Sequence, residues 1–306
     1  MTGPGDPQGR VAALERLIQA EVGRNMTALF AAAQGGLLGA AMAVAALRSG
    51  GIGVITGFYV PRGTPPAAET DGPIGAALLI KALTAIGLSC RLATDEACRS
   101  ACAAALAGAG AAAVPIDAAR PGAALDDIIA RWRDAGIVLA LAIERCGRSA
   151  DGAPRNMRGE DISAHTAALD ELFLAGPWDT IAVGDGGNEI GMGALPPDLI
   201  ARHVDHGARI ACVTPAHHLI VAGVSNWGAY ALLAALAVLR ADWRERLLAC
   251  LDPEVDRAIL KAAVEQGPAV DGVSRRRTLT VDNLDLAVHH EKLRALRALV
   301  EAGHGL

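Results

Sequence analysis

Thr180–Gly193 reads TIAVGDGGNEIGMG, a short apolar run followed by a glycine-rich turn. The first four residues predict a buried β-strand, because apolar and β-branched side chains pack well in a sheet. Five glycines follow within ten residues and surround Asp185, Asn188 and Glu189. Glycine lets the backbone approach a ligand closely, and open α/β sheets bind ligands beyond the carboxyl ends of their strands. The stretch therefore predicts a site for a small polar molecule or a hard metal ion at the end of a parallel strand.

Strand-like and helix-like segments alternate through the rest of the chain. The candidate strands are Ile52–Phe58, Ser89–Ala93, Ala111–Ile116, Ile137–Ile143, Asp179–Val183 and Ala208–Val213. The candidate helices are Val11–Val22, a segment ending near Leu47, Pro73–Ile86, Glu96–Ala107, Leu125–Ala135, Ala164–Leu174, Trp227–Leu239, Glu254–Glu265 and His289–Ala302. Such alternation is typical of a parallel sheet covered by helices. We predict one α/β domain over residues 1–306, with a mostly parallel sheet, helices on both faces and an N-terminal helical segment, residues 1–50, packed on it.

The composition narrows the class of protein. A chain of 306 residues with 52% hydrophobic residues suits one large globular domain, and a net charge of −5 argues against a nucleic-acid-binding surface. Six cysteines without a C-x-x-C pair, and no signal peptide at the start, predict a reduced, cytoplasmic protein. Two uncharged runs, 25–47 and 219–239, are rich in alanine and contain polar residues, so we predict buried helices and no membrane partner. Self-association as a homo-oligomer stays open.

A second candidate motif is ETDGPIGA at Glu69–Ala76, which follows the strand ending in Thr-Gly-Phe. Its proline marks the first turn of a helix, which Asp71 or Thr70 would cap. The free N–H groups of such a helix start also suit a substrate carboxylate. We therefore predict Thr56, Asp71 and Gly72 as substrate-binding residues. An ordinary N-cap is the alternative explanation for Asp71.

Arginines and carboxylates are dense in Glu144–Ser163, directly after a very apolar predicted strand. The planar fork of arginine matches a carboxylate with two hydrogen bonds, so Arg148 and Arg158 are candidate clamps for an acidic substrate. A surface ion-pair network would leave the same pattern.

Carboxylates are the candidate ligands for a cation. Asp185 and Glu189 are four residues apart, which places both on one side if the segment is helical. With Glu69 and Asp71 they make an oxygen donor set that suits Mg²⁺ or Mn²⁺ better than zinc. The same turn offers further substrate-binding groups at Gly186, Gly187 and Asn188. The alternative is a plain glycine-rich turn with Asp and Asn as turn formers.

Other cofactor motifs are missing from the sequence. It contains no G-x-G-x-x-G and no Walker-type Gly-Lys-Ser/Thr, which argues against NAD and ATP. No lysine stands in a glycine-rich motif, which argues against pyridoxal phosphate. His217 or His218 is a candidate general base from its residue type, although such a pair is more often peripheral.

The chain resembles the carboxyl-terminal domain of the D-glutamate cyclase family over about residues 10–300. The matching blocks are Thr56–Phe58, Glu69–Pro73, Glu144–Arg148, Asp151–Gly152, Asn156–Gly159, Asp161–Ser163 and Gly184–Gly193, with weaker matches at Val224–Gly228 and Val270–Ser274. Ala194 stands where the family usually has Lys or Arg, and Tyr59–Pro61 also departs from the family pattern.

This resemblance implies a hydro-lyase that closes D-glutamate to 5-oxo-D-proline and releases water. Considered against this reaction, the catalytic candidates are Asp185, Glu189, Asp161 and Arg148. A metal held by the carboxylates, or alternatively Arg148 or Arg158, would neutralise the γ-carboxylate of the substrate. Asp161 or a histidine would accept a proton from the substrate ammonium. Two other functions fit the same residues, namely a Mg²⁺- or Mn²⁺-dependent phosphatase or phosphoesterase and a non-catalytic amino-acid-binding module.

Overall fold

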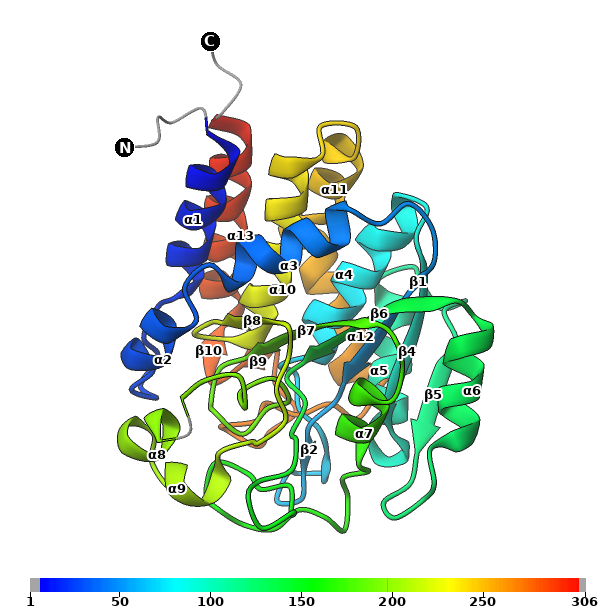
Figure 1. Ribbon diagram of the computed structural model, residues 1–306, viewed down its shortest axis with the longest axis vertical. Helices are drawn as coiled ribbons and strands as arrows, with labels where there is room; N and C mark the ends of the chain where they lie inside the picture. Colours follow the sequence, from blue (N-terminus) through cyan, green and yellow to red (C-terminus); the bar gives the residue numbers. More distant parts are fainter. Residues whose placement is uncertain (1–5, 197, 303–306) are drawn as a thin grey trace.

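The computed structural model describes residues 6–196 and 198–302, which form a central parallel sheet and its covering helices (Figure 1). The strands of the sheet are β1 (Gly51–Thr56), β4 (Ser89–Asp95), β5 (Ile116–Ala119), β6 (Ile137–Ile143), β7 (Asp179–Gly184) and β8 (His218–Val221). They lie in the order β5-β4-β1-β6-β7-β8, and all neighbouring pairs are parallel. This is the strand order of doubly wound sheets, which reverses between β1 and β6. The predicted α/β class is confirmed.

Helices cover both faces of the sheet. The larger layer consists of α1 (Pro7–Ile18), α3 (Gly36–Ala45), α4 (Pro73–Ala85), α5 (Arg99–Gly108), α10 (Ser225–Leu239), α11 (Arg244–Cys250), α12 (Pro253–Glu265) and α13 (Leu286–Glu301). The other layer consists of α2 (Thr27–Ala32), α6 (Asp126–Asp134), α7 (Leu169–Leu174), α8 (Leu199–His203) and α9 (Gly207–Ile210). Strand residues alternate between the two cores: Leu139 and Leu141 enter the first, and Ala140 and Ala142 the second.

Short elements complete the edge of the sheet where the strands end. A short 3₁₀ helix, η1 (Glu96–Cys98), links β4 to α5. Two small antiparallel hairpins, β2 (Tyr59–Val60) with β3 (Ala67–Ala68) and β9 (Thr280–Val281) with β10 (Leu284–Asp285), follow β1 and precede α13. Both hairpins contribute residues to the site described below.

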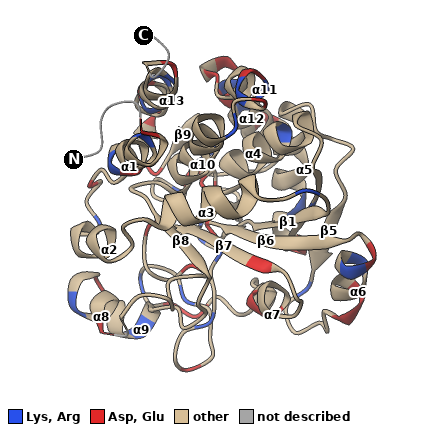
Figure 2. Cartoon of the chain, turned by 45° about the horizontal axis from the view of Figure 1, so that its top comes forward, with Lys and Arg blue, Asp and Glu red and all other residues tan. Residues whose placement is uncertain are grey.

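The helix α10 lies at the centre of the larger layer, against α1, α3, α4 and α13. Neither α10 nor α3 contains a charged residue (Figure 2), and nearly every residue of α10 is buried. The uncharged run 219–239 thus forms β8 and α10, and the run 25–47 forms α2 and α3. Within the described ranges, the helices are too short or too polar to cross a bilayer.

One predicted strand is wrong, and several predicted elements have other bounds in the structure. Residues 208–213 are not a strand, because α9 occupies their first part, and the sixth strand is β8 further along the chain. Hydrophobic periodicity cannot separate a short buried strand from a buried helix, and β8 merges into the apolar run that continues as α10. Of the predicted strand Ala111–Ile116 only Ile116 belongs to β5, and of the predicted helix Ala164–Leu174 only Leu169–Leu174 is helical.

The first helix ends at Ile18, before the predicted Val22, because the chain turns around Glu21. The Glu21 carboxylate accepts hydrogen bonds from the backbone N–H groups of residues 23–26. This turn lies between α1 and α2 and brings the side chain of Arg24 to the edge of the sheet where β7 ends.

Candidate active site

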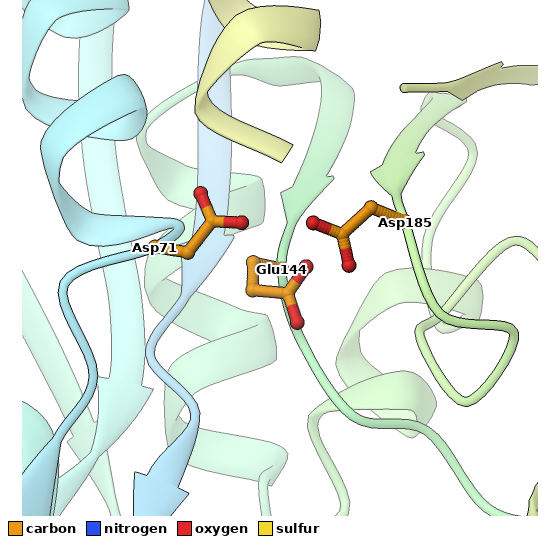
Figure 3. A group of neighbouring side chains, drawn as sticks. All are labelled: Asp71, Glu144 and Asp185. Carbon is orange, nitrogen blue, oxygen red and sulfur yellow. The ribbon is translucent and has the colours of Figure 1, made fainter. Parts of the chain in front are cut away.

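A group of buried carboxylates lies beside the point where the strand order reverses. Asp71 lies just before α4, Glu144 directly follows β6, and Asp185 directly follows β7. One carboxylate oxygen of each residue lies within 4.8 Å of the others. Figure 3 shows the three side chains converging from separate loops. We call Asp71, Glu144 and Asp185 the acidic triad. Doubly wound sheets bind their ligands at this place in the fold.

The first turns of α4 and α10 cap each other beside the triad. Asp71 accepts hydrogen bonds from the backbone N–H groups of Ser225 (2.9 Å) and Asn226 (2.8 Å) at the start of α10. Asn226 Oδ1 accepts hydrogen bonds from the N–H groups of Gly72 (3.0 Å) and Gly75 (2.7 Å) at the start of α4. The prediction that Asp71 caps its own helix is therefore wrong. The N-cap residue of α4 is Gly72, so the side chain that caps this helix comes from α10.

Replacing Asn226 by alanine is expected to lower the free energy of unfolding by about 1–2 kcal/mol, the usual cost of a lost N-cap. The buried N–H group of Gly75 would lose its acceptor, and that of Gly72 would keep only Asp71 Oδ1 (3.0 Å). Urea denaturation followed by circular dichroism measures the change. An unfolding midpoint equal to that of the wild type would mean that α4 does not depend on this cap.

A cavity of about 310 Å³ opens next to the triad. Its buried wall, which we call the acidic floor, consists of Glu69, Glu144, Asp185, Glu189 and Asp282. Its more exposed side, which we call the arginine rim, carries Arg62, Arg158 and Arg275. The cavity therefore has a buried negative wall and a more exposed side on which these three arginines outnumber two carboxylates, Glu160 and Asp205.

The backbone is strained around this cavity. Glu144 has a φ of 44°, in the left-handed region that is rare for its residue type. Among the described residues other than glycine, six have a positive φ, and four of these line the cavity: Asn25, Glu144, Arg275 and Asp282. Such conformations cost free energy and concentrate at functional sites.

One guanidinium reaches the acidic floor. Arg24 contacts Asp185 (Nη1 to Oδ2, 2.6 Å) and Asp282 (Nη2 to Oδ1, 2.8 Å). Burial alone would lower the pKa of Arg24, but these two carboxylates raise it well above its ordinary value. Burial, and then the neighbouring Asp185 and Glu189, raise the pKa of Glu144 well above its ordinary value. The floor thus holds more carboxylates than the single charge of Arg24 can neutralise.

The triad fits a hard divalent cation. Converging carboxylate oxygens with surplus negative charge are the donors that such ions prefer. Of the predicted metal ligands, Asp71 and Asp185 belong to the triad, and Glu144 completes it. The other two predicted ligands, Glu69 and Glu189, line the cavity beside the triad.

The family model described as "D-glutamate cyclase-like, C-terminal" matches residues 14–297 of this chain. The chain belongs to the D-glutamate cyclase-like family. The resemblance drawn from the sequence blocks is confirmed. The matched range contains the acidic triad, the acidic floor, the arginine rim and Arg24, so the whole site lies within the D-glutamate cyclase-like domain.

A human relative shares part of its length with this D-glutamate cyclase-like chain. The D-glutamate cyclase, mitochondrial, of Homo sapiens is 33% identical over 226 residues, which cover 66% of this chain and 35% of the human protein. The chain therefore spans about a third of the length of that relative. Because the human protein is named as mitochondrial, the cytoplasmic location expected for this chain stays a prediction.

Two of the predicted substrate-binding residues line the cavity of this D-glutamate cyclase-like domain, and two more support one of its carboxylates. Arg158 and Asn188 line it. Gly186 and Gly187 form the turn that holds Glu189. The Gly187 N–H donates to Glu189 Oε2 (2.8 Å), and a Cβ on Gly186 would lie 2.9 Å from Glu189 Oε1. The glycine-rich turn therefore positions a carboxylate of the acidic floor.

Thr56 and Gly72 lie behind the cavity and do not line it. Thr56 is fully buried and donates a hydrogen bond to the carbonyl oxygen of Ile143 (2.8 Å). A Cβ on Gly72 would lie 2.7 Å from the Cβ of Glu144. Both residues support the position of Glu144 and are out of reach of a ligand in the cavity.

Three other candidates lie away from the triad. Arg148 forms an ion pair with Asp170 and lines a separate cavity of about 220 Å³. Asp161 is exposed and accepts hydrogen bonds only within its own loop. His217 contacts Asp179 at the first residue of β7, at the opposite edge of the sheet from the triad. The structure does not bring these residues to the cavity, so none of them enters the function proposed below.

Several residues at the site are absent from the set of site residues predicted from the sequence: Arg24, Arg62, Glu144, Ser225, Asn226, Arg275 and Asp282. Glu144 carried the same signal as Asp185, since each directly follows a buried apolar strand. Arg24 and Asp282 come from opposite ends of the chain, and no local pattern connects them.

Proposed function

We propose that this chain is a D-glutamate cyclase, a hydro-lyase that converts D-glutamate to 5-oxo-D-proline and water. The observation that carries the proposal is the cavity with an acidic floor on one side and an arginine rim on the other. An acidic amino acid carries one ammonium and two carboxylates, and so matches both walls. Membership of the D-glutamate cyclase-like family and the name of the human relative support the same reaction.

The arginine rim would bind the substrate carboxylates. Arg62 forms an ion pair with Glu160, whereas Arg158 and Arg275 make no salt bridge within the part of the chain that the structure describes. Burial, and then the charges of Arg275 and Arg62, lower the pKa of Arg158. A carboxylate placed here would relieve the repulsion between the guanidinium groups and accept paired hydrogen bonds from them.

In the proposed reaction, the α-amine attacks Cδ of the γ-carboxylate, and a new C–N bond closes the ring. The ammonium gives up two protons and the γ-carboxylate gives up one oxygen, and these leave together as water. A γ-carboxylate is a poor electrophile, so the positive charge of Arg24 or of a bound cation is needed to neutralise it. Glu69 and Glu189 on the acidic floor are available to accept a proton. Holding both substrate carboxylates would add rate through proximity.

We further propose that the acidic triad holds Mg²⁺ or Mn²⁺, because carboxylate oxygens suit these ions. Such an ion, when bound, would act as a Lewis acid on the γ-carboxylate. Asp71→Asn is expected to weaken Mn²⁺ binding at least about tenfold, as measured by electron paramagnetic resonance of the free ion. Asp161→Asn removes the same charge from an exposed loop and is expected to leave the affinity unchanged. Equal affinities for the wild type and Asp71→Asn would exclude the triad as the metal site.

The proposed reaction is tested with purified protein and with D-glutamate and L-glutamate separately. Chiral chromatography with mass spectrometry quantifies 5-oxoproline. We expect 5-oxo-D-proline from D-glutamate, a lower rate after dialysis against EDTA, and recovery when Mn²⁺ or Mg²⁺ is added. No product with either ion supplied would contradict the proposal.

A metal-dependent phosphatase or phosphoesterase is the second candidate. The guanidinium groups of Arg158 and Arg275 would suit a phosphate group as well as a carboxylate. Hydrolysis of a phosphate ester that is lost in Asp185→Asn, together with no 5-oxoproline, would favour this candidate. A non-catalytic amino-acid-binding module fits less well, because the acidic floor carries more carboxylates than a site that only binds an anionic amino acid would need.

A further inference from the structure

Two buried acceptor atoms of the cavity lining have no hydrogen-bond partner among the described residues: Asn188 Oδ1 and Asp282 Oδ2. Asn188 is 1% exposed, and the side chain of Asp282 is 5% exposed. A buried acceptor without a donor is unfavourable, and folded proteins satisfy nearly all such atoms. Both atoms belong to residues that line the same cavity, where a ligand can supply the missing donors.

The orientation of the Asn188 amide follows from its other contact. Its Nδ2 donates a hydrogen bond to the backbone carbonyl oxygen of Arg155 (2.7 Å). A flipped amide would place Oδ1 against that carbonyl oxygen, and two acceptors cannot bond to each other. The backbone of Asn188 is also held, because its carbonyl oxygen accepts the N–H of Gly147 (3.0 Å). Oδ1 is therefore a fixed acceptor on a residue that lines the cavity.

Asp282 is held just as firmly. It lies at the tip of the β9–β10 hairpin, where Asp282 (φ 54°) and Asn283 (φ 60°) both adopt the left-handed conformation. The Asn283 N–H donates to Asp271 Oδ2 (2.7 Å), which ties the tip to the neighbouring loop. Asp282 Oδ1 accepts from Arg24 (2.8 Å), so the second oxygen, Oδ2, is the one that stays unpaired.

We infer that Asn188 and Asp282 form an ammonium subsite, which makes the site selective for α-amino dicarboxylic acids over dicarboxylic acids that lack the amine. This inference rests on the proposed function, since it assigns the residues that bind the amine of the same substrate. An ammonium has three N–H donors, which is enough for both unpaired acceptors and for one carboxylate of the acidic floor. A ligand without the amine would leave both acceptors unpaired, and sites built for a polar group reject analogues that lack it.

Asp282→Asn is the decisive variant. Asparagine adopts the left-handed conformation readily, so the hairpin tip is kept. Its oxygen stays on Arg24, and its NH₂ group replaces the unpaired Oδ2 with a donor that repels an ammonium. Asp285→Asn is the matched control, because it makes the same change at an exposed position of the same hairpin. Asn188→Leu removes the second acceptor independently.

Isothermal titration calorimetry measures the affinity of EDTA-dialysed protein for D-glutamate and for glutarate, and 5-oxoproline is assayed in the same samples before and after Mn²⁺ or Mg²⁺ is added. We expect the wild type and Asp285→Asn to prefer D-glutamate by at least about thirtyfold. Asp282→Asn and Asn188→Leu are each expected to lose at least about tenfold of this preference through weaker D-glutamate binding, with glutarate binding unchanged. Unfolding midpoints confirm that both variants fold.

Three outcomes would overturn the inference: no preference for D-glutamate in the wild type, no binding of either ligand, or an equal loss for both ligands in Asp282→Asn. An equal loss accompanied by weaker Mn²⁺ binding would assign the unpaired acceptors to water molecules on a metal. The assay does not require turnover. Amine-dependent binding without any 5-oxoproline, even after Mn²⁺ or Mg²⁺ is added, would keep the subsite and reject the proposed cyclase activity. Turnover without amine-dependent binding would do the reverse.

Discussion

Replacing Glu144 by glutamine is expected to reduce the turnover of D-glutamate about 10³-fold, a loss typical of a missing acid–base or electrophile-activating group. Glutamine keeps the size of the side chain and an oxygen for the Ser225 hydroxyl, which lies 2.6 Å from Glu144 Oε2. The substitution removes one negative charge from the acidic triad. Without this charge, residue 144 can act neither as an anionic metal ligand nor as a proton acceptor. The expected loss of turnover is therefore the same for either role.

Steady-state kinetics with detection of 5-oxoproline by mass spectrometry measures the effect of Glu144→Gln. The matched control is Glu171→Gln, since the Glu171 side chain is 57% exposed and lies outside the cavity. We expect the control to keep the wild-type rate. A folded Glu144→Gln variant that retains more than about a tenth of wild-type turnover would contradict the placement of the reaction at the triad.

Replacing Asp95 by asparagine is expected to lower the free energy of unfolding by about 3–5 kcal/mol, the cost of leaving one member of a buried ion pair unpaired. The side chains of Asp95 and Arg145 are both 1% exposed and contact each other directly. Arg145 also donates to the carbonyl oxygens of Gly57 (2.8 Å) and Ala167 (2.7 Å). Asparagine would leave the guanidinium charge inside the protein without a counter-charge.

Urea denaturation measures the stability of the Asp95→Asn variant. The same substitution at Asp242, which forms an exposed ion pair with Arg240, is the control and is expected to leave the midpoint unchanged. If the two variants unfold at the same urea concentration, the buried pair does not stabilise the fold as argued. Arg145 directly follows Glu144, so this pair also anchors the loop that carries one member of the acidic triad.

Much of the fold could be predicted because its signals are local. The apolar strand Ile137–Ile143 is buried between two strands, so its whole length is hydrophobic and its bounds in the structure equal the predicted ones. The strand β8 could not be separated from α10, because an apolar run has the same pattern in either conformation. The turn around Glu21, which ends α1 early, depends on the contacts of one side chain that no periodicity describes.

The candidate site could be predicted only in part. Asp185 and Glu189 stand in a motif whose glycine content exceeds what a turn requires, so the sequence alone singled them out. Glu144 does not stand among several glycines. In the same predicted block, Arg148 is the residue type that more commonly binds an acidic substrate. The structure places Glu144 in the triad and Arg148 on Asp170, at another cavity.

By itself the sequence determined the α/β class, the family and the glycine-rich turn after β7, because strand and helix periodicity and turn chemistry act over a few residues. Only the tertiary structure decided that Asp71, Glu144 and Asp185 form one triad, and that Arg24 and Asp282 join it from opposite ends of the chain. The physical reason is that loops meet according to the strand order and the packing of helices on the sheet. The strand order and the helix packing depend on the burial of the whole core, so no short stretch of sequence specifies them.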